Sequence, residues 1–285
     1  MTFRVWDVVS EGVSLAASRN GAVLAGFFIA AETLGLFLFL VAGTMYVPVD
    51  VGTGLPSGSE VPTGELSEPA MGVATLLTGV FTSVVTIPIS LVAIRTFVGG
   101  ETNGIPDAFI FRRIGWATAA GVVASFAQSA LLFAIPFGVL IGAIALVFVL
   151  SGTPLLIGWL VLLVLGLAAV VVVWLHFLFL LHEIGVRDRG VVGAFRGSWA
   201  TVRGNRLKLA LLAAGLALIR LSAGFGAVPP ADGEWTIFEL VTMPIWLLLS
   251  GIIGVFSAAI FARAYRTLRS DVDGARLRAD FENDW

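Results

Sequence analysis

Long apolar runs constrain this chain more than any other feature of its sequence. They occupy residues 21–43, 70–95, 113–149, 154–181, 206–225 and 237–263. A helix rises about 1.5 Å per residue, so each run is long enough to cross a hydrocarbon core about 30 Å thick. The chain is 58% hydrophobic and 13% charged, whereas about 25% of a soluble domain is charged. The sequence therefore predicts an all-α fold, a polytopic transmembrane bundle of about six spans.

Basic residues are concentrated in alternate connecting segments. Sixteen of the 17 basic residues lie in segments 1–20, 95–113, 182–208 and the stretch from 263 onward, and none lies in 44–69, 150–153 or 226–236. The positive-inside rule therefore predicts a multi-pass protein of the cell membrane with both termini in the cytoplasm. Run 21–43 exceeds the 7–15 residues or so of a signal-peptide core, so we interpret it as an uncleaved first span.

The third run, 113–149, is too long for a simple crossing. A helix of this length would extend roughly 55 Å, well beyond the bilayer core. Pro136 removes a backbone hydrogen bond and predicts a kink within one span. A re-entrant half-helix over 137–149 is the alternative.

Two segments flank the predicted membrane domain, which extends over 21–265. Residues 1–20 place Phe3, Trp6, Val9, Val13 and Ala16 on one helical face. This pattern predicts an amphipathic helix that lies in the membrane interface or packs, in the cytoplasm, on the inner end of the bundle. Residues 266–285 are predicted to form a polar cytoplasmic tail.

A second amphipathic helix is predicted near residues 190–203. Its apolar face would carry Val191, Phe195, Trp199 and Val202, and Gly204-Asn205 would end it. Arg189, Arg196 and Arg203 stand seven residues apart on another face. Together with Trp199, these arginines are candidate contacts for anionic lipid headgroups. Topology signalling alone would also require arginines, but it would not require their helical register.

The same stretch carries a family resemblance. VVGAFRGSWATVRGNRLKLALL, from Val191 to Leu212, resembles the "Ala-aromatic-x-x-Ser-Trp-x-x-Val-x-Gly-Asn" signature of uncharacterised, haloarchaeal-type prokaryotic six-helix membrane proteins. Those proteins are similar to the membrane domain of glycerophosphodiester phosphodiesterases. The matching positions are Ala194, Phe195, Ser198, Trp199, Val202, Gly204 and Asn205. The resemblance implies an architecture and not an activity, because the phosphodiesterase barrel has no counterpart here.

Ionisable side chains inside membrane spans are costly and are therefore candidates for a specific role. Glu32 and Arg220 stand at similar distances from the starts of the first and fifth spans. Their depth and opposite charge predict a buried intramembrane ion pair that fixes these two helices together. A substrate-binding or proton-relay role is the alternative.

The sequence contains little that indicates catalysis. It has no cysteine, and His176 and His182 are its two histidines, which are too few for the usual ligands of a catalytic zinc ion. No P-loop, GxSxG elbow or dinucleotide fingerprint occurs. We therefore expect no catalytic, cofactor or metal site, no enzyme activity and no nucleic-acid partner.

The function predicted from these features is a general one. The chain is expected to be a non-enzymatic structural or accessory membrane module whose partners are membrane lipids. A transporter or a lipid-handling protein is the alternative. Lys208 is the only lysine among the 17 basic residues, and loop 44–69 is acidic, which is typical of a halophilic archaeon.

Overall fold

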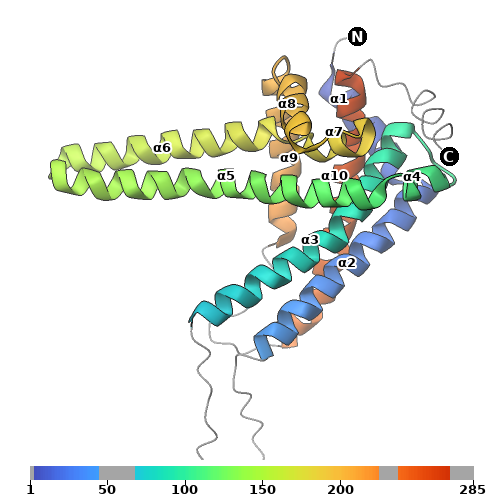
Figure 1. Ribbon diagram of the computed structural model, residues 1–285, viewed down its shortest axis with the longest axis horizontal. Helices are drawn as coiled ribbons and strands as arrows, with labels where there is room; N and C mark the ends of the chain where they lie inside the picture. The colour runs from blue at the N-terminus through green and yellow to red at the C-terminus, as the bar shows by residue number, and fades with distance from the viewer. Residues whose placement is uncertain (1–2, 45–67, 225–236, 270–285) are drawn as a thin grey trace, which may run out of the picture.

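The computed structural model describes residues 3–44, 68–224 and 237–269, and within these ranges it is built from helices without a strand (Figure 1). The long helices are α2 (Arg19–Thr44), α3 (Glu68–Gly99), α5 (Ile114–Val149), α6 (Thr153–His176), α9 (Arg206–Gly224) and α10 (Ile237–Leu268). The short helices are α1 (Val5–Ala16), α4 (Asp107–Phe111), α7 (Leu180–Arg187) and α8 (Val191–Val202). The predicted all-α fold is confirmed, and each apolar run is helical. The loops predicted at 44–69 and 226–236 lie almost wholly outside the described residues.

Four helical segments are long and apolar enough to cross a membrane. They are Arg19–Leu38, Ile114–Val149, Thr153–Arg187 and Pro244–Leu268, and Ser83–Gly99 is a shorter apolar helix. Helices of this length and composition define a membrane protein. Six crossings, and the side of the membrane on which the termini lie, stay predictions.

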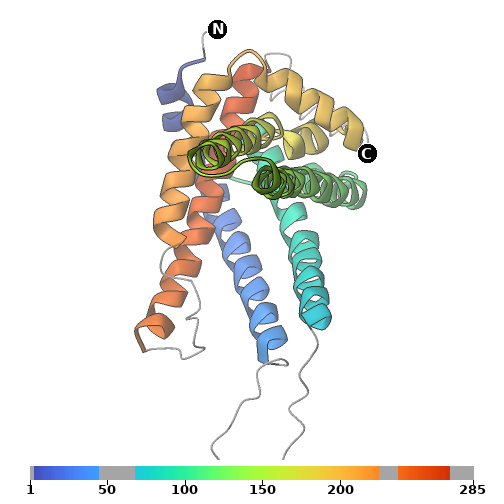
Figure 2. The same ribbon diagram turned by 90° about the vertical axis from the view of Figure 1, so that its left-hand side faces the viewer.

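Helix α10 is the centre of the packed helices. It contacts α1, α2, α3 and α9, and Figure 2 shows α9, α10, α2 and α3 side by side in that order. Glycines allow the close approaches: a Cβ at Gly12 would lie 2.7 Å from the Ile260 backbone, and one at Gly251 would overlap Ile29. Small residues at helix contacts are typical of membrane bundles, in which close packing replaces the hydrophobic effect.

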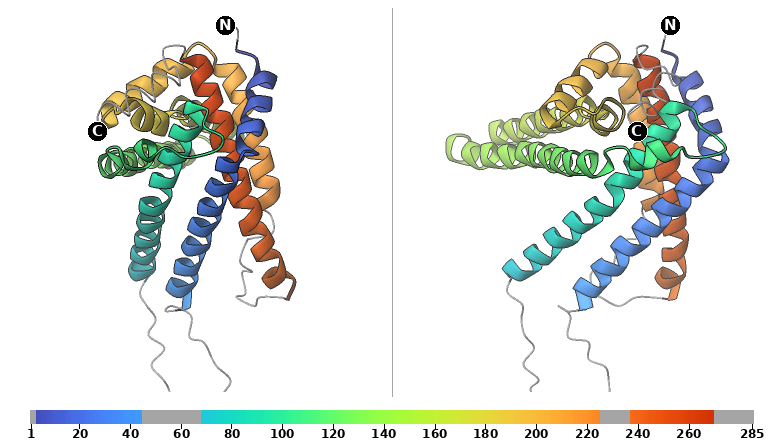
Figure 3. Two further views of the ribbon diagram at one scale, coloured as in Figure 1. Left: turned by 90° about the vertical axis from the view of Figure 1, so that its right-hand side faces the viewer. Right: turned by 45° about the vertical axis from the view of Figure 1, so that its right-hand side comes forward.

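Helices α5 and α6 form an antiparallel hairpin that extends away from the other helices. Figures 1 and 3 show it running across the direction of α10. Gly152, at φ 63°, stands in the connection between the two helices. Helix α5 continues through Pro136 to Val149, so residues 137–149 are part of one long helix, and its path through the membrane stays a prediction. The apolar segments of this hairpin are almost wholly unburied, as expected for helices that face lipid.

The fourth predicted span, 154–181, is interrupted. Helix α6 ends at His176, and α7 starts at Leu180 after a turn. At the other end of the chain, α10 continues to Leu268, so the predicted boundary at 265 between membrane domain and tail falls inside a helix. The rest of the predicted tail, from 270 onward, lies outside the described residues.

Helix α1 packs against α10 through a face that overlaps the predicted one in part, because Phe3 and Ala16 of the predicted face are buried. The residues it buries are Val8, Gly12 and Ala16, whereas Trp6 is 77% exposed. Gly12 lies on the packed face because only a glycine allows this approach to Ile260. Hydrophobic periodicity cannot detect such a position, since glycine contributes little to an apolar pattern. The packed helix fits the second predicted arrangement, and its depth relative to the membrane stays a prediction.

Candidate functional site at the arginine-rich end

Two arginines at one end of the helices pair with a buried carboxylate. Glu183 of α7 is fully buried and lies between the guanidinium groups of Arg189 and Arg269. Each guanidinium approaches a different carboxylate oxygen to 2.9 Å, and the Thr201 hydroxyl donates a hydrogen bond to the same side chain at 3.3 Å. A buried charge is costly unless it is paired and hydrogen-bonded, so these partners compensate for the burial of Glu183.

Three separate parts of the chain meet at this carboxylate. We call the four residues involved, Glu183, Arg189, Thr201 and Arg269, the Glu183 cluster. Arg269 follows directly after α10, and its guanidinium also donates to the Thr201 hydroxyl at 2.9 Å. Gly197 of α8 makes room for the cluster, because a Cβ there would overlap both Arg189 and Glu183. The cluster therefore joins α7, α8 and the end of α10 through its ion pairs and through the close approach that Gly197 allows.

A fully buried arginine, Arg95, joins α3 to α4 and α7. Its Nε donates to the carbonyl oxygen of Gly185 at 2.8 Å, and its Nη1 donates to the carbonyls of Phe109 and Arg112 at 3.1 and 2.9 Å. Asp188 lies 3.2 Å from the Arg112 guanidinium and 4.0 Å from that of Arg95. Arg95 is fully buried, so it is a structural side chain at this end of the fold.

Ser198 of α8 hydrogen-bonds to backbone groups at the break between α6 and α7. Its hydroxyl accepts a hydrogen bond from the Phe179 backbone N–H at 3.1 Å and donates one to the His176 carbonyl at 2.7 Å. The next residue, Trp199, stacks on the His176 ring with the ring centroids 3.9 Å apart. A helix break frees backbone groups that need new partners, and Ser198 supplies them.

The remaining residues of the 191–212 signature also have structural positions. Phe195 contacts the edge of Phe177, with the ring centroids 4.6 Å apart, and Ala194 and Val202 are fully buried. The Asn205 carbonyl accepts the first hydrogen bond of α9. The signature residues thus pack α8 against its neighbours and form the start of α9.

The four residues predicted to contact lipid headgroups fall into two groups. Arg196 and Arg203 are exposed, and Trp199 is 42% exposed although it stacks on His176. Arg189 is instead paired with the buried Glu183. The face of α8 that packs coincides only in part with the predicted apolar one. Val202 is buried and Val191 and Phe195 pack against the core, but the other buried residues are Ala194, Gly197, Ser198 and Thr201. Small side chains allow α8 to approach its neighbours, whereas the periodicity favoured the larger ones.

The structure brings the predicted pair Glu32 and Arg220 together. A guanidinium nitrogen lies 4.0 Å from a carboxylate oxygen, and the two side chains are 32% and 64% exposed. The helices do not enclose the two charges, and the intramembrane position of the pair stays a prediction. Helix α10 packs against both α2 and α9, and the pair links these two helices beside it.

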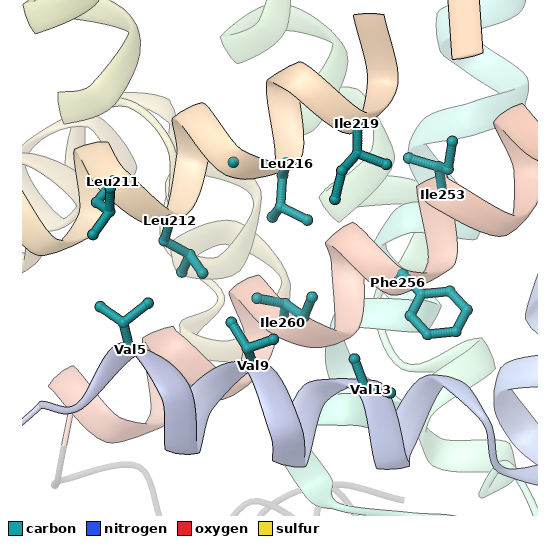
Figure 4. A pocket seen from close by; sticks show the side chains of 11 residues that line it. Val5, Val9, Val13, Leu211, Leu212, Leu216, Ile219, Ile253, Phe256 and Ile260 are labelled. Carbon is teal, nitrogen blue, oxygen red and sulfur yellow. The ribbon is translucent and has the colours of Figure 1, made fainter. Parts of the chain in front are cut away.

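An apolar groove lies between α1, α9 and α10 (Figure 4). The side chains of α1 and α9 point toward one another across it, and those of α10 form its floor. Its volume is about 380 Å³, within the range of small-molecule sites. The lining residues are Val5, Val9, Val13, Leu211, Leu212, Gly215, Leu216, Ile219, Ile253, Phe256 and Ile260.

The groove was not predicted from the sequence. Its valines on α1 follow the expected helical spacing, but the partners on α9 and α10 are ordinary apolar residues of membrane helices. Within the described residues, no group of three or more His, Asp or Glu side chains is placed to hold a metal ion.

These features define a helical membrane protein whose arginine-rich end is held by buried ion pairs. Residues 3–268 match the model of the family "Domain of unknown function (DUF7847)", and the chain belongs to that family. The comparisons with curated proteins and with solved structures found no match.

Proposed function

We propose that this protein is a multi-pass module of the cell membrane with six crossings and with its arginine-rich end in the cytoplasm. Six long helices coincide with the six apolar runs, which supports the number of crossings, and the α5–α6 hairpin, which runs across α10 in the structure (Figure 1), would lie along α10 in the membrane. The ion pair between Glu11 and Arg263 brings α1 and the end of α10 to the same end of the fold, as an even number of crossings requires. The concentration of arginines at this end supports its cytoplasmic placement.

The module is non-enzymatic in this proposal, and it serves as a structural or accessory unit that contacts anionic lipids. The observation that carries the proposal is the outer face of α8, where Arg196 and Arg203 are exposed beside Trp199. Indole rings favour the membrane interface, and each arginine near an anionic surface contributes about 1 kcal/mol of attraction. We name this set of three residues the α8 surface.

The α8 surface is tested by the lipids that the protein retains. Protein reconstituted with equal amounts of phosphatidylglycerol and phosphatidylcholine is extracted in mild detergent, and the retained lipids are counted by mass spectrometry. The wild-type protein should retain an excess of phosphatidylglycerol, and the Arg196→Gln/Arg203→Gln variant should lose that excess several-fold. Arg19→Gln/Arg113→Gln is the matched control, because both of these arginines are exposed in the same end of the fold.

Equal retention in the α8 variant and the wild-type protein would refute this contact. A second measurement at higher ionic strength separates charge from packing, because salt screens exposed charges over about 10 Å or less. The excess of phosphatidylglycerol should fall with salt in the wild-type protein and change little in the α8 variant.

Lipid handling is the second candidate function, and the apolar groove is the observation that favours it over a hydrophilic transport pathway. We also propose that the chain shares its ancestry with the membrane domain of glycerophosphodiester phosphodiesterases and comes from a halophilic archaeon. The signature at 191–212 supports the first of these, because its residues form the joint between α6, α7 and α8.

A further inference from the structure

We propose that the groove between α1, α9 and α10 binds one hydrocarbon chain of an anionic membrane lipid, with the lipid headgroup at Lys208. This inference rests on the proposed membrane placement, but it concerns a different surface from the α8 surface. It assigns a defined binding site for one lipid molecule, in addition to the general contact of the protein surface with lipid headgroups.

The lining of the groove selects an apolar occupant. Every lining side chain is that of Val, Leu, Ile or Phe, and Gly215 adds none. Water in such a groove would lack hydrogen-bond partners, whereas a hydrocarbon chain would remove apolar surface from contact with water or loose lipid. Gly215 lies where an added Cβ would meet no atom within 4 Å, so this part of the wall borders open space.

The length of the groove matches one leaflet of a bilayer. Along α9 the lining residues extend from Leu211 to Ile219, about 12 Å at the helical rise of about 1.5 Å per residue, and Ile219 lies about 16 Å beyond Lys208. Half of a hydrocarbon core about 30 Å thick is close to this length. Figure 4 shows the walls from α1 and α9 running side by side along the groove, as a single chain aligned with the helices would require.

A cation stands at one end of the groove. Lys208 lies about one helical turn before Leu211 and Leu212, and its ammonium donates to the Phe3 carbonyl at 2.9 Å. This bond links α9 to the start of α1 and holds the ammonium near Val5 at the end of the groove. An ammonium has three donors, so it can bind an anionic oxygen while it keeps the Phe3 contact. The charge at this end and the apolar lining beyond it together match an anionic lipid.

Two substitutions test the two halves of this site. Gly215→Phe adds a side chain whose Cβ meets no atom within 4 Å, so that its ring can fill the open part of the groove. Gly26→Phe is its matched control, because Gly26 also faces open space on a long apolar helix. Lys208→Gln removes the charge and keeps a donor for the Phe3 carbonyl. Val9→Phe narrows the groove from its opposite wall and replaces Gly215→Phe if the latter does not fold.

The measurement is native mass spectrometry of the protein reconstituted with equal amounts of phosphatidylglycerol and phosphatidylcholine and then released from mild detergent. We expect one tightly held phosphatidylglycerol per chain in the wild-type protein and in Gly26→Phe. Gly215→Phe should lower that occupancy at least tenfold. Lys208→Gln should keep a bound lipid but reduce the preference for phosphatidylglycerol by about fivefold, as expected for the loss of one cation.

The outcomes separate this site from the α8 surface. A bound lipid that survives Arg196→Gln/Arg203→Gln but not Gly215→Phe supports the groove, whether or not the α8 surface also attracts lipid. Unchanged occupancy in Gly215→Phe overturns the proposal, and so does a mass that corresponds to detergent or to a free fatty acid. A dimer that is lost in Gly215→Phe would show a second copy in the groove and would also overturn it.

Discussion

Replacement of Gly197 by alanine should destabilise the protein by displacing a buried ion pair. The new methyl group would occupy space now filled by the Arg189 guanidinium and the Glu183 carboxylate. Glu183 is fully enclosed and cannot retreat, so the methyl group must push Arg189 away from it. The Arg269 guanidinium, 2.9 Å from the other carboxylate oxygen, would remain.

The expected magnitude follows from two opposing effects. Breaking a buried ion pair costs about 3–5 kcal/mol, and the low end applies because the Arg189 side chain is 35% exposed. Alanine in place of glycine stabilises a helix interior by about 1 kcal/mol. The net loss for Gly197→Ala should therefore be about 2 kcal/mol of the free energy of unfolding.

Gly193 of the same helix provides the control. A Cβ at this position would lie 3.5 Å from the Arg189 Cβ, which is an ordinary contact, so Gly193→Ala should stabilise the protein by about 1 kcal/mol. Unfolding by sodium dodecyl sulfate in mixed micelles, followed by tryptophan fluorescence, measures both variants on one scale. A difference below about 1 kcal/mol between them, where about 3 kcal/mol is expected, would refute the account of Gly197.

Three further changes test other contacts by the same unfolding measurement. Ser198→Ala should cost about 1–3 kcal/mol, because it leaves two backbone groups at the α6–α7 break without their partner, whereas a neutral result would mean that other groups satisfy them. Gly12→Ala should cost about 1–3 kcal/mol through overlap with the Ile260 backbone, and a gain in stability would show that α1 does not pack this closely on α10. Glu32→Gln and Arg220→Gln should show a coupling of at most about 1 kcal/mol in a double-mutant cycle, because both side chains are partly exposed, and a much larger coupling would mean that the pair is enclosed in the membrane.

The sequence predicted the helices well because the bilayer imposes long apolar runs. Their order and approximate bounds agree with α2, α3, α5, α6, α9 and α10. The break at 177–179 was missed, since the apolar run continues through it and no Pro or Gly marks it. What permits the break is the Ser198 hydroxyl, about twenty residues away, and periodicity carries no information about such a partner.

The Glu183 cluster was missed for a related reason. Arg189 was predicted to contact lipid headgroups and Arg269 was counted as a topology signal, because in a hydropathy profile both are indistinguishable from exposed arginines. Glu183 lies next to His182 at the end of an apolar run, where a charged residue is expected in any case. One signal was available, because Gly197 interrupts a helix that otherwise has a regular pattern. A glycine within a helix indicates a close approach, but it does not identify what approaches.

The arginines at this end therefore fall into two sets, one that stabilises the fold and one that, in our proposal, contacts lipid. A count of basic residues does not distinguish the two. Arg95, Arg189 and Arg269 hold the ends of α3, α7, α8 and α10 together, and their loss should lower the stability of the fold in any lipid. Arg196 and Arg203 make no such internal contact in the described residues, and their loss should alter lipid preference with little effect on stability. If all five substitutions to glutamine shifted lipid preference and stability in the same proportion, this division would be wrong. If the two groups separate, the cationic surface that contacts anionic lipids is smaller than the arginine content of the sequence implies.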